Sequence, residues 1–92
     1  MMFEGNIHLT FKHHKLEIRQ IVGDNIRCLR NKAGITQSVL AEKTGLNNDY
    51  IGRLERSLEN ISVDNLVKLA VVFNVDVSNL LIEDWCFSLS QS

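Results

Sequence analysis

The sequence predicts a compact all-α domain built from five short helices. Apolar residues recur at spacings of three and four from Ile18 to Leu81, which is the period of an amphipathic helix. Residue types that favour helix ends stand between these apolar stretches. Proline is absent and only five glycines occur in 92 residues, so no linker is apparent. A chain of this length forms one domain by default.

The first two helices are bounded by glycines. The first is expected from Ile18 to about Lys32, with Gly34 as its C-terminal stop. Its apolar face consists of Ile18, Ile21, Val22, Ile26 and Leu29. Thr36 is of a type that caps helix N-termini, and Gly45 ends the second, shorter helix.

Three further helices each follow a capping residue. Asn47, Ser62 and Asp76 are N-cap types, and each precedes apolar residues at helical spacing. Asn74 suits a left-handed position after the fourth helix. The inward-facing residues expected here are Tyr50, Ile51 and Leu54 in the third helix, Leu66, Leu69, Ala70 and Phe73 in the fourth, and Leu80 and Leu81 in the fifth.

Both ends of the chain place apolar residues at every second position, which is the period of a β-strand. These residues are Ile7, Leu9 and Phe11 near the N-terminus and Trp85, Phe87 and Leu89 near the C-terminus. Short terminal strands, frayed ends and an N-terminal extension of the first helix all remain open at this point. We therefore divide the chain into an extension at 1–17, a helical domain at 18–83 and a tail at 84–92 that could form a dimerisation strand.

The net charge of −1 hides an uneven distribution. Residues 12–59 carry nine Lys and Arg against six Asp and Glu, whereas residues 60–92 carry one Lys against four acidic residues. The positive excess therefore lies in the first part of the helical domain. This distribution is compatible with a polyanionic partner for that part and with a different role for the acidic part.

No apolar run approaches the roughly 20 residues needed to cross a membrane. The N-terminal residues do not show the basic start and apolar core of a signal peptide. Cys28 and Cys86 lie far apart and form no CxxC pair. We expect reduced thiols in a cytoplasmic protein, with neither a disulfide nor a zinc site.

Metal binding and catalysis have little support in the sequence. His13, His14 and Glu17 offer two nitrogens and a carboxylate within about one helical turn, but no further ligand group is nearby. Cys86 and the histidines do not form a recognisable set of nucleophile, base and orienting group. We expect no metal site, no cofactor and no enzymatic activity.

The segment from Gln37 to Arg56 joins two short helices through a tight turn and reads QSVLAEKTGLNNDYIGRLER. Ala41 is small enough for a close helix contact, and Gly45 can adopt a positive φ at the turn. Leu46 fills the corner between the helices. The face of the third helix expected to point outward carries Asn48, Asp49, Gly52 and Arg53. A polar helix face presented in this way can enter the major groove of DNA.

These features resemble the Cro and phage-repressor type of helix-turn-helix protein, the XRE family. The resemblance runs from about Ile21 to Leu81. It is carried by the runs TQSVLAEKTG and RLER, by Ile51, by NIS at 60–62 and by LVKLAVVFNVDVSNLL. The resemblance implies a five-helix, repressor-like domain at 18–83 that binds double-stranded DNA.

The family pattern implies a role for each matching position. The residues expected to contact bases are Asn48, Asp49, Gly52 and Arg53. The residues expected to contact phosphate are Gln37, Asn47, Arg56 and Asn60. Arg53 suits guanine, Asn48 suits adenine and Asp49 could accept from cytosine. Arg30 and Glu55 match an ion pair that ties the first helix to the third.

The sequence departs from the pattern after the third helix. Relatives often have glycine and a basic residue there, whereas this chain has Ser57, Leu58 and Glu59. Glu59 would repel phosphate and lower affinity. Gly52 within a helix costs about 1 kcal/mol relative to alanine, so it either weakens the helix or permits close approach to DNA. Two other roles remain open. Arg53 could be a solvated surface arginine, and Asp49 could be an acidic residue that stabilises the helix N-terminus.

The resemblance implies a transcriptional repressor or other regulator that binds an inverted repeat as a homodimer. A controller protein of a restriction–modification system belongs to the same class. The alternative is an antitoxin, with a toxin or other protein as partner, because residues 1–17 and 84–92 add segments to the domain. The residues expected at the dimer interface are Val77, Leu80, Leu81, Trp85 and Phe87, with Leu89 beside them.

Overall fold

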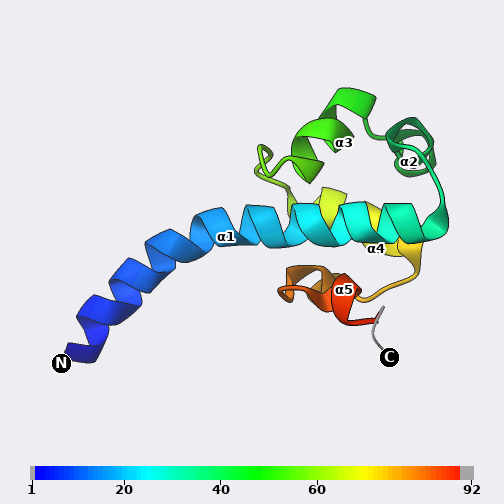
Figure 1. The fold of residues 1–92 in the computed structure, drawn as a ribbon. Helices are drawn as coiled ribbons and strands as arrows, with labels where there is room; N and C mark the ends of the chain where they lie inside the picture. Colours follow the sequence, from blue (N-terminus) through cyan, green and yellow to red (C-terminus); the bar gives the residue numbers. More distant parts are fainter. Residues whose placement is uncertain (1, 90–92) are drawn as a thin grey trace.

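The computed structural model describes the backbone of residues 2–89 and the side chains of residues 18–89. Within that range the fold is entirely helical (Figure 1). The elements are α1 (Met2–Ala33), α2 (Gln37–Thr44), α3 (Asn48–Glu55), α4 (Val63–Phe73), the 3-10 helix η1 (Val77–Leu81) and α5 (Trp85–Leu89). The all-α prediction is confirmed, although the expected fifth helix is a 3-10 helix and α5 follows it.

The expectation of terminal strands is wrong. α1 runs without a break from Met2 to Ala33, so the alternative of an extended first helix holds. Trp85–Leu89 forms α5, and its backbone is bonded locally, with the N–H of Ser88 donating to the carbonyl of Asp84 at 2.9 Å. Alternating apolar residues over only five positions do not distinguish a β-strand from an α-helix, because Trp85 and Leu89 also share one face of a helix.

The predicted capping residues begin their helices. Thr36 Oγ1 accepts from the N–H of Val39 at 3.1 Å, and Asn47 Oδ1 accepts from the N–H of Asp49 at 2.7 Å. Ser62 caps α4 in the same way. Each cap pairs a backbone N–H that the first helical turn leaves without a partner inside the helix.

The predicted stops also adopt the expected conformations. Gly34 and Gly45 have φ values of 69° and 73°, and Asn74 has a φ of 53°. These left-handed residues end α1, α2 and α4. Asp76 stands before η1 as predicted, but its side chain forms no capping hydrogen bond.

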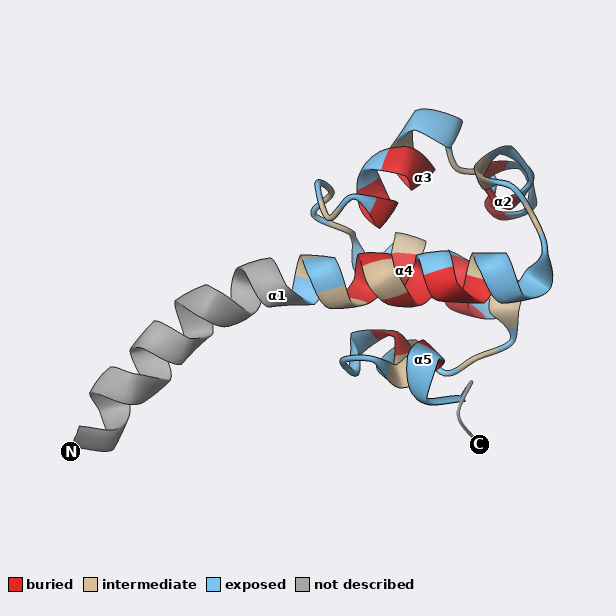
Figure 2. Ribbon diagram, in the orientation of Figure 1, coloured by how far each residue is buried: buried red, intermediate tan, exposed pale blue. Residues whose placement is uncertain are grey.

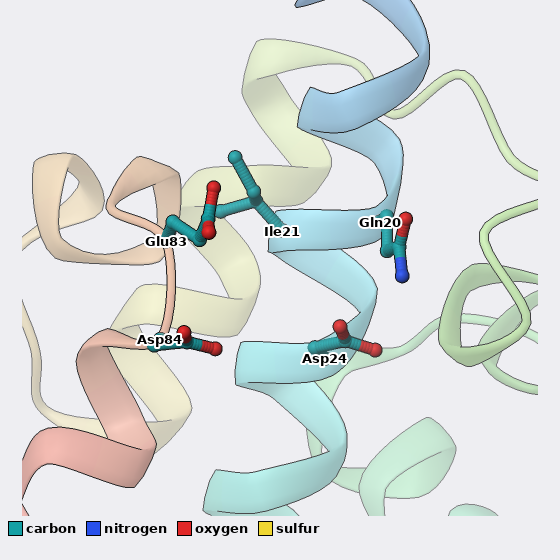
Figure 3. A pocket seen from close by; sticks show the side chains of 5 residues that line it. All are labelled: Gln20, Ile21, Asp24, Glu83 and Asp84. Atoms are coloured by element: carbon teal, nitrogen blue, oxygen red, sulfur yellow. The ribbon is translucent and has the colours of Figure 1, made fainter.

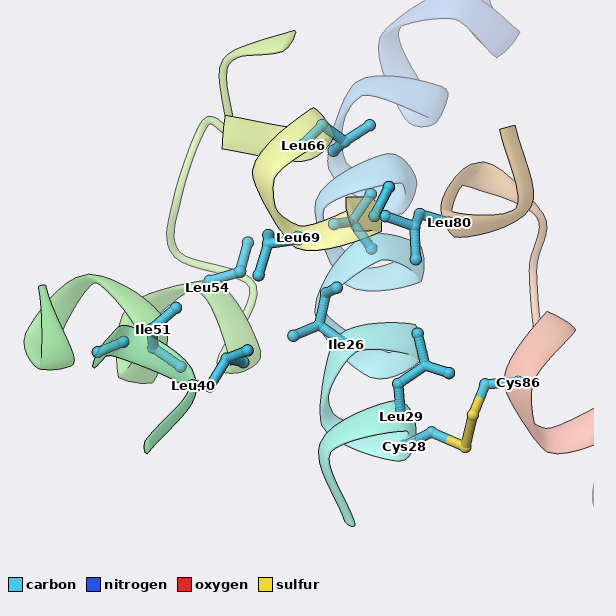
Figure 4. Packing of buried hydrophobic residues seen from close by; sticks show 13 residues of the cluster. Ile26, Cys28, Leu29, Leu40, Ile51, Leu54, Leu66, Leu69, Leu80 and Cys86 are labelled. Carbon is cyan, nitrogen blue, oxygen red and sulfur yellow. A yellow bond between two sulfur atoms is a disulfide. The ribbon is translucent and has the colours of Figure 1, made fainter. Parts of the chain in front are cut away.

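α1 is the central element of the core. Figure 1 shows α2 and α3 on one side of α1 and α5 on the other. α1 contacts α3 on one side and η1 and α5 on the other, and its buried residues are coloured red in Figure 2. The fully buried apolar side chains, most of which are labelled in Figure 4, are Val22, Ile26, Leu40, Ile51, Leu54, Leu69, Leu80 and Cys86. Ile18, expected on the buried face, is 40% exposed.

Gly23 allows α1 to approach α3 closely. A Cβ atom at this position would lie 2.5 Å from the carbonyl oxygen of Leu54, which is too close for any side chain. The oxygen belongs to the backbone, so it cannot move without displacing the end of α3. This role of Gly23 was not predicted from the sequence, because its neighbour Leu54 lies 31 positions away.

Two further contacts fasten the C-terminal segment to α1. The Nδ2 of the buried Asn25 donates to the carbonyls of Leu80 (3.1 Å) and Ile82 (2.9 Å), and its Oδ1 accepts from the N–H of Cys86 at 3.0 Å. Cys28 and Cys86 form a disulfide with a Cα–Cα distance of 6.0 Å (Figure 4). The expectation of reduced thiols is therefore wrong, because α5 folds back onto α1 and brings together cysteines 58 positions apart.

Candidate nucleic-acid interface

α2 and α3 meet at a turn held by hydrogen bonds. The N–H of Leu46 donates to the carbonyl of Ala41 at 3.0 Å, with Gly45 in the left-handed conformation between them. The buried Thr44 hydroxyl donates to the carbonyl of Leu40 at 2.8 Å and accepts from the N–H of Leu46 at 3.2 Å. The turn therefore fixes the angle between the two helices, as the helix-turn-helix pattern requires.

The structure brings Arg30 and Glu55 together as a bidentate ion pair. Arg30 Nε lies 2.6 Å from Glu55 Oε2, and Arg30 Nη2 lies 2.9 Å from Glu55 Oε1. Nη1 donates to the carbonyl of Ile35 at 3.0 Å. The Arg30 and Glu55 side chains are only 14% and 3% exposed. The hydrogen bond to Glu55 raises the pKa of Arg30 above its ordinary value, with burial acting in the opposite direction.

Gln37 joins this pair. It is the first residue of α2, and its Nε2 donates to Glu55 Oε1 at 3.1 Å. One carboxylate therefore connects residues from α1, α2 and α3. A phosphate contact by Gln37 would have to use the remaining hydrogen-bonding capacity of its side-chain amide.

The outward face of α3 is narrower than the sequence suggested. Asn48, Asp49 and Arg53 are exposed, and Asn48 Oδ1 accepts from the hydroxyl of Ser38 on α2 at 3.3 Å. Gly52 is buried in the free chain, and its base contact stays a prediction. A Cβ built there would meet Gln37 Oε1 at 3.5 Å and Arg56 Nη1 at 3.8 Å. Two longer side chains therefore cover this position.

Three other predicted phosphate contacts lie around α3. Asn47, Arg56 and Asn60 are exposed, at the start of α3, at its end and in the loop that follows. Arg53, the predicted guanine contact, forms an ion pair with Glu59 in the same loop. This pair was not predicted from the sequence.

The predicted dimer interface divides into exposed and buried residues. Leu80 is 0% exposed and belongs to the core, so its assignment to an interface is corrected. Val77 and Trp85 are half-buried and pack against the core. Leu81 and Phe87 are 44% and 49% exposed, and Ile82, which the sequence analysis did not select, is 50% exposed.

A cavity of about 310 Å³ lies between α1 and the loop that joins η1 to α5. Its lining residues, shown in Figure 3, are Gln20, Ile21, Asp24, Glu83 and Asp84. The three carboxylates make it an unfavourable place for DNA. Among the described side chains, no group of three His, Cys, Asp or Glu residues has the arrangement of a metal site. His13, His14 and Glu17 lie outside those side chains.

No helix in the described part of the chain combines the length and the apolar character needed to cross a membrane.

Residues 26–80 match the model of a helix-turn-helix family. The control protein C.SmaI of Serratia marcescens is 38% identical over 66 residues, which cover 72% of this chain and 79% of that protein. The transcriptional regulator SinR of Bacillus subtilis is 38% identical over 64 residues, which cover 68% of this chain and 58% of SinR.

Solved structures show the same arrangement. The crystal structure of a hypothetical transcription factor, NHTF, from Neisseria matches with a TM-score of 0.71 and 29% identity, covering 82% of this chain and 85% of that one. A crystal structure of SinR in complex with DNA matches with a TM-score of 0.64 and 37% identity, covering 66% of this chain and 98% of that one.

Proposed function

The chain belongs to the XRE-type helix-turn-helix family, and from this premise we propose that it is a sequence-specific DNA-binding transcriptional regulator that represses as a homodimer. The observation that carries the proposal is the two-sided character of α3. Ile51 and Leu54 are buried in the core, whereas Asn48, Asp49 and Arg53 face solvent. A helix held so firmly on one side presents its other side as a rigid reading surface.

Direct reading of bases falls to the three exposed residues. Arg53 can donate to O6 and N7 of guanine, Asn48 can pair with adenine, and Asp49 can accept from N4 of cytosine. Base contacts carry sequence information, because each base pair presents a distinct pattern in the major groove.

Phosphate contacts position the helix and carry no direct sequence information. We assign this role to Gln37, Asn47, Arg56 and Asn60, which border α3 at its start, its end and the neighbouring helix. The positive excess of residues 12–59 supports approach to DNA from this side.

Such a regulator acts where the chromosome is, so we place it in the cytoplasm.

A homodimer would double the number of bases that are read. We infer that the exposed apolar residues Leu81, Ile82 and Phe87, on η1, the following loop and α5, form the dimer surface. α5 and α3 lie on opposite sides of α1 in Figure 1, so a partner on this surface leaves α3 uncovered. Two recognition helices related by two-fold symmetry would read half-sites about 34 Å apart.

The similarity to C.SmaI favours a specific version of this function. That relative is a control protein, and the matched region covers most of its length. We infer that this chain could serve as the controller of a restriction–modification system. A methyltransferase or endonuclease gene beside its own, with an inverted repeat in their shared promoter, would support this version. Neighbouring genes with no such relation would remove the support for the controller role and leave the proposal of a general transcriptional regulator in place.

Two alanine variants test the proposed function. An operator would first be selected from a randomised duplex pool, and then binding to that operator and to a scrambled duplex would be titrated. Arg53→Ala should weaken operator binding by about 1–3 kcal/mol and relax preference at one base position. Gln37→Ala should weaken binding to the operator and to the scrambled duplex about equally, because phosphate contacts are independent of sequence. Failure of the pool to yield any preferred sequence would refute the function itself.

A further inference from the structure

We propose that Glu59 is a specificity-determining residue, which holds Arg53 in position to read a base and keeps it from binding phosphate. This inference rests on the proposed function. Arg53 Nε and Glu59 Oε2 form an ion pair that joins the outward face of α3 to the loop after it.

The turn after α3 brings the two residues together. The N–H of Leu58 donates to the carbonyl of Arg53 at 2.9 Å, and the N–H of Ser57 donates to the carbonyl of Leu54 at 3.0 Å. Ser57 adopts a left-handed φ of 65°. These are the bonds of a Schellman motif, which ends a helix and reverses the chain. The next residue, Glu59, therefore returns beside Arg53.

The pair uses only part of the donor capacity of Arg53. A guanidinium has five N–H donors in a fixed planar fork. Arg53 contacts Glu59 through Nε, which leaves the four donors on Nη1 and Nη2 for a base. Guanine O6 and N7 require two donors in one plane. Glu59 can therefore stay bound to Arg53 while Arg53 contacts guanine.

Phosphate presents a different situation. An arginine without a protein partner can turn toward the phosphate backbone of either DNA strand. Such phosphate contacts favour all DNA sequences equally. Here the guanidinium is held on one side, and the carboxylate that holds it repels phosphate. The side chain of Arg53 is 45% exposed and that of Glu59 only 19%, so the arginine is the outer member of the pair. Glu59 thus does more than weaken affinity, the effect predicted from the sequence alone.

Arg53, the outer member of the pair, is 45% exposed, and ion pairs at the surface add little to stability. Glu59→Gln should therefore yield a folded protein, which circular dichroism would verify. Glu83→Gln is the matched control. It removes the same charge from the loop between η1 and α5, on the cavity lining described above.

The experiment measures dissociation constants for the selected operator and the scrambled duplex at one salt concentration. Glu59→Gln should tighten binding to scrambled DNA and reduce the ratio of operator to scrambled affinity by roughly five- to tenfold, the lower range for one bidentate base contact. The lost preference should fall at the base position that Arg53→Ala relaxes. In the Arg53→Ala background, Glu59→Gln should leave the ratio unchanged. Glu83→Gln should leave it unchanged in the wild-type background.

Equal tightening on both duplexes, with the ratio preserved, would show that Glu59 only repels phosphate and would overturn the inference. An equally large loss of ratio in the Arg53→Ala background would also overturn it. A wild-type protein that fails to distinguish operator from scrambled DNA would instead overturn the proposed function, and this inference with it.

Discussion

The side-chain amide of Gln37 donates to the same Glu55 oxygen that accepts from Arg30, at 3.1 and 2.9 Å respectively. The predicted phosphate-binding residue at the start of α2 is therefore attached to the ion pair that ties α1 to α3. Because Glu55 is almost wholly buried, its carboxylate depends on these partners in place of water. Orientation of Gln37 toward DNA and stability of the domain consequently share one residue.

We expect strong coupling between Arg30 and Glu55. Arg30→Ala leaves a buried carboxylate and Glu55→Ala leaves a mostly buried guanidinium, so each change should destabilise by about 3–5 kcal/mol. The double variant should cost clearly less than the sum, because no charge is left unpaired. Urea unfolding of the four proteins measures this cycle, and additive costs would contradict the coupling.

Gly23 and Gly52 should respond to alanine in opposite directions. At Gly23 the added Cβ meets the Leu54 carbonyl oxygen at 2.5 Å, so Gly23→Ala should destabilise by about 1–3 kcal/mol through overpacking. At Gly52 the nearest atom is the end of the Gln37 side chain at 3.5 Å, an ordinary contact. Gly52→Ala should therefore stabilise by up to about 1 kcal/mol through helix propensity. Thermal unfolding of both variants measures these changes in stability. A loss of stability in Gly52→Ala as large as in Gly23→Ala would show that the side chains of Gln37 and Arg56 cannot move aside for the added methyl group.

The Cys28–Cys86 disulfide should contribute substantially to stability. It closes a loop across a sequence separation of 58 residues, and restriction of the unfolded chain by such a loop is worth about 4 kcal/mol. A reducing agent should lower the unfolding free energy of the wild type by this amount. The same agent should have no effect on a variant with both cysteines changed to alanine.

A thiol titration in denaturant provides the independent check for this disulfide. The oxidised protein should show no reactive thiol, and full reactivity before any reduction would contradict the bond. Reduction should not release α5 completely, because Asn25 still holds the segment through the backbone of Leu80, Ile82 and Cys86.

The dimer is best tested at Phe87. Deletion of residues 84–92 would remove Cys86 and a partner of Asn25, and so would disturb the core as well as any interface. Phe87→Glu places a charge on the exposed apolar surface and should shift a dimer toward monomer and weaken operator binding. Val63→Glu is the control, since Val63 is an exposed apolar residue on α4. Light scattering behind a sizing column would report an unchanged mass for Phe87→Glu if the surface has no role.

The sequence by itself determined the features that depend on neighbouring residues. The caps at Thr36, Asn47 and Ser62 act within three positions along the chain, and the turn at Gly45 depends on the backbone freedom of one residue. The inward positions of Ile51 and Leu54 follow from helical spacing. These local rules were sufficient to predict α2 and α3 and most of the exposed face of α3.

Only the tertiary structure decided which distant residues meet. Helical periodicity contains no information about the carbonyl opposite Gly23, the cysteine opposite Cys28 or the side chains above Gly52. The same holds for Arg53 and Glu59, six positions apart, because the left-handed turn at Ser57 brings them together. Leu80 matched a helical pattern that suited an interface and a core equally well, and its burial depends on how η1 packs against α1. Each outcome is set by the path of the chain between the residues, which only the packed fold specifies.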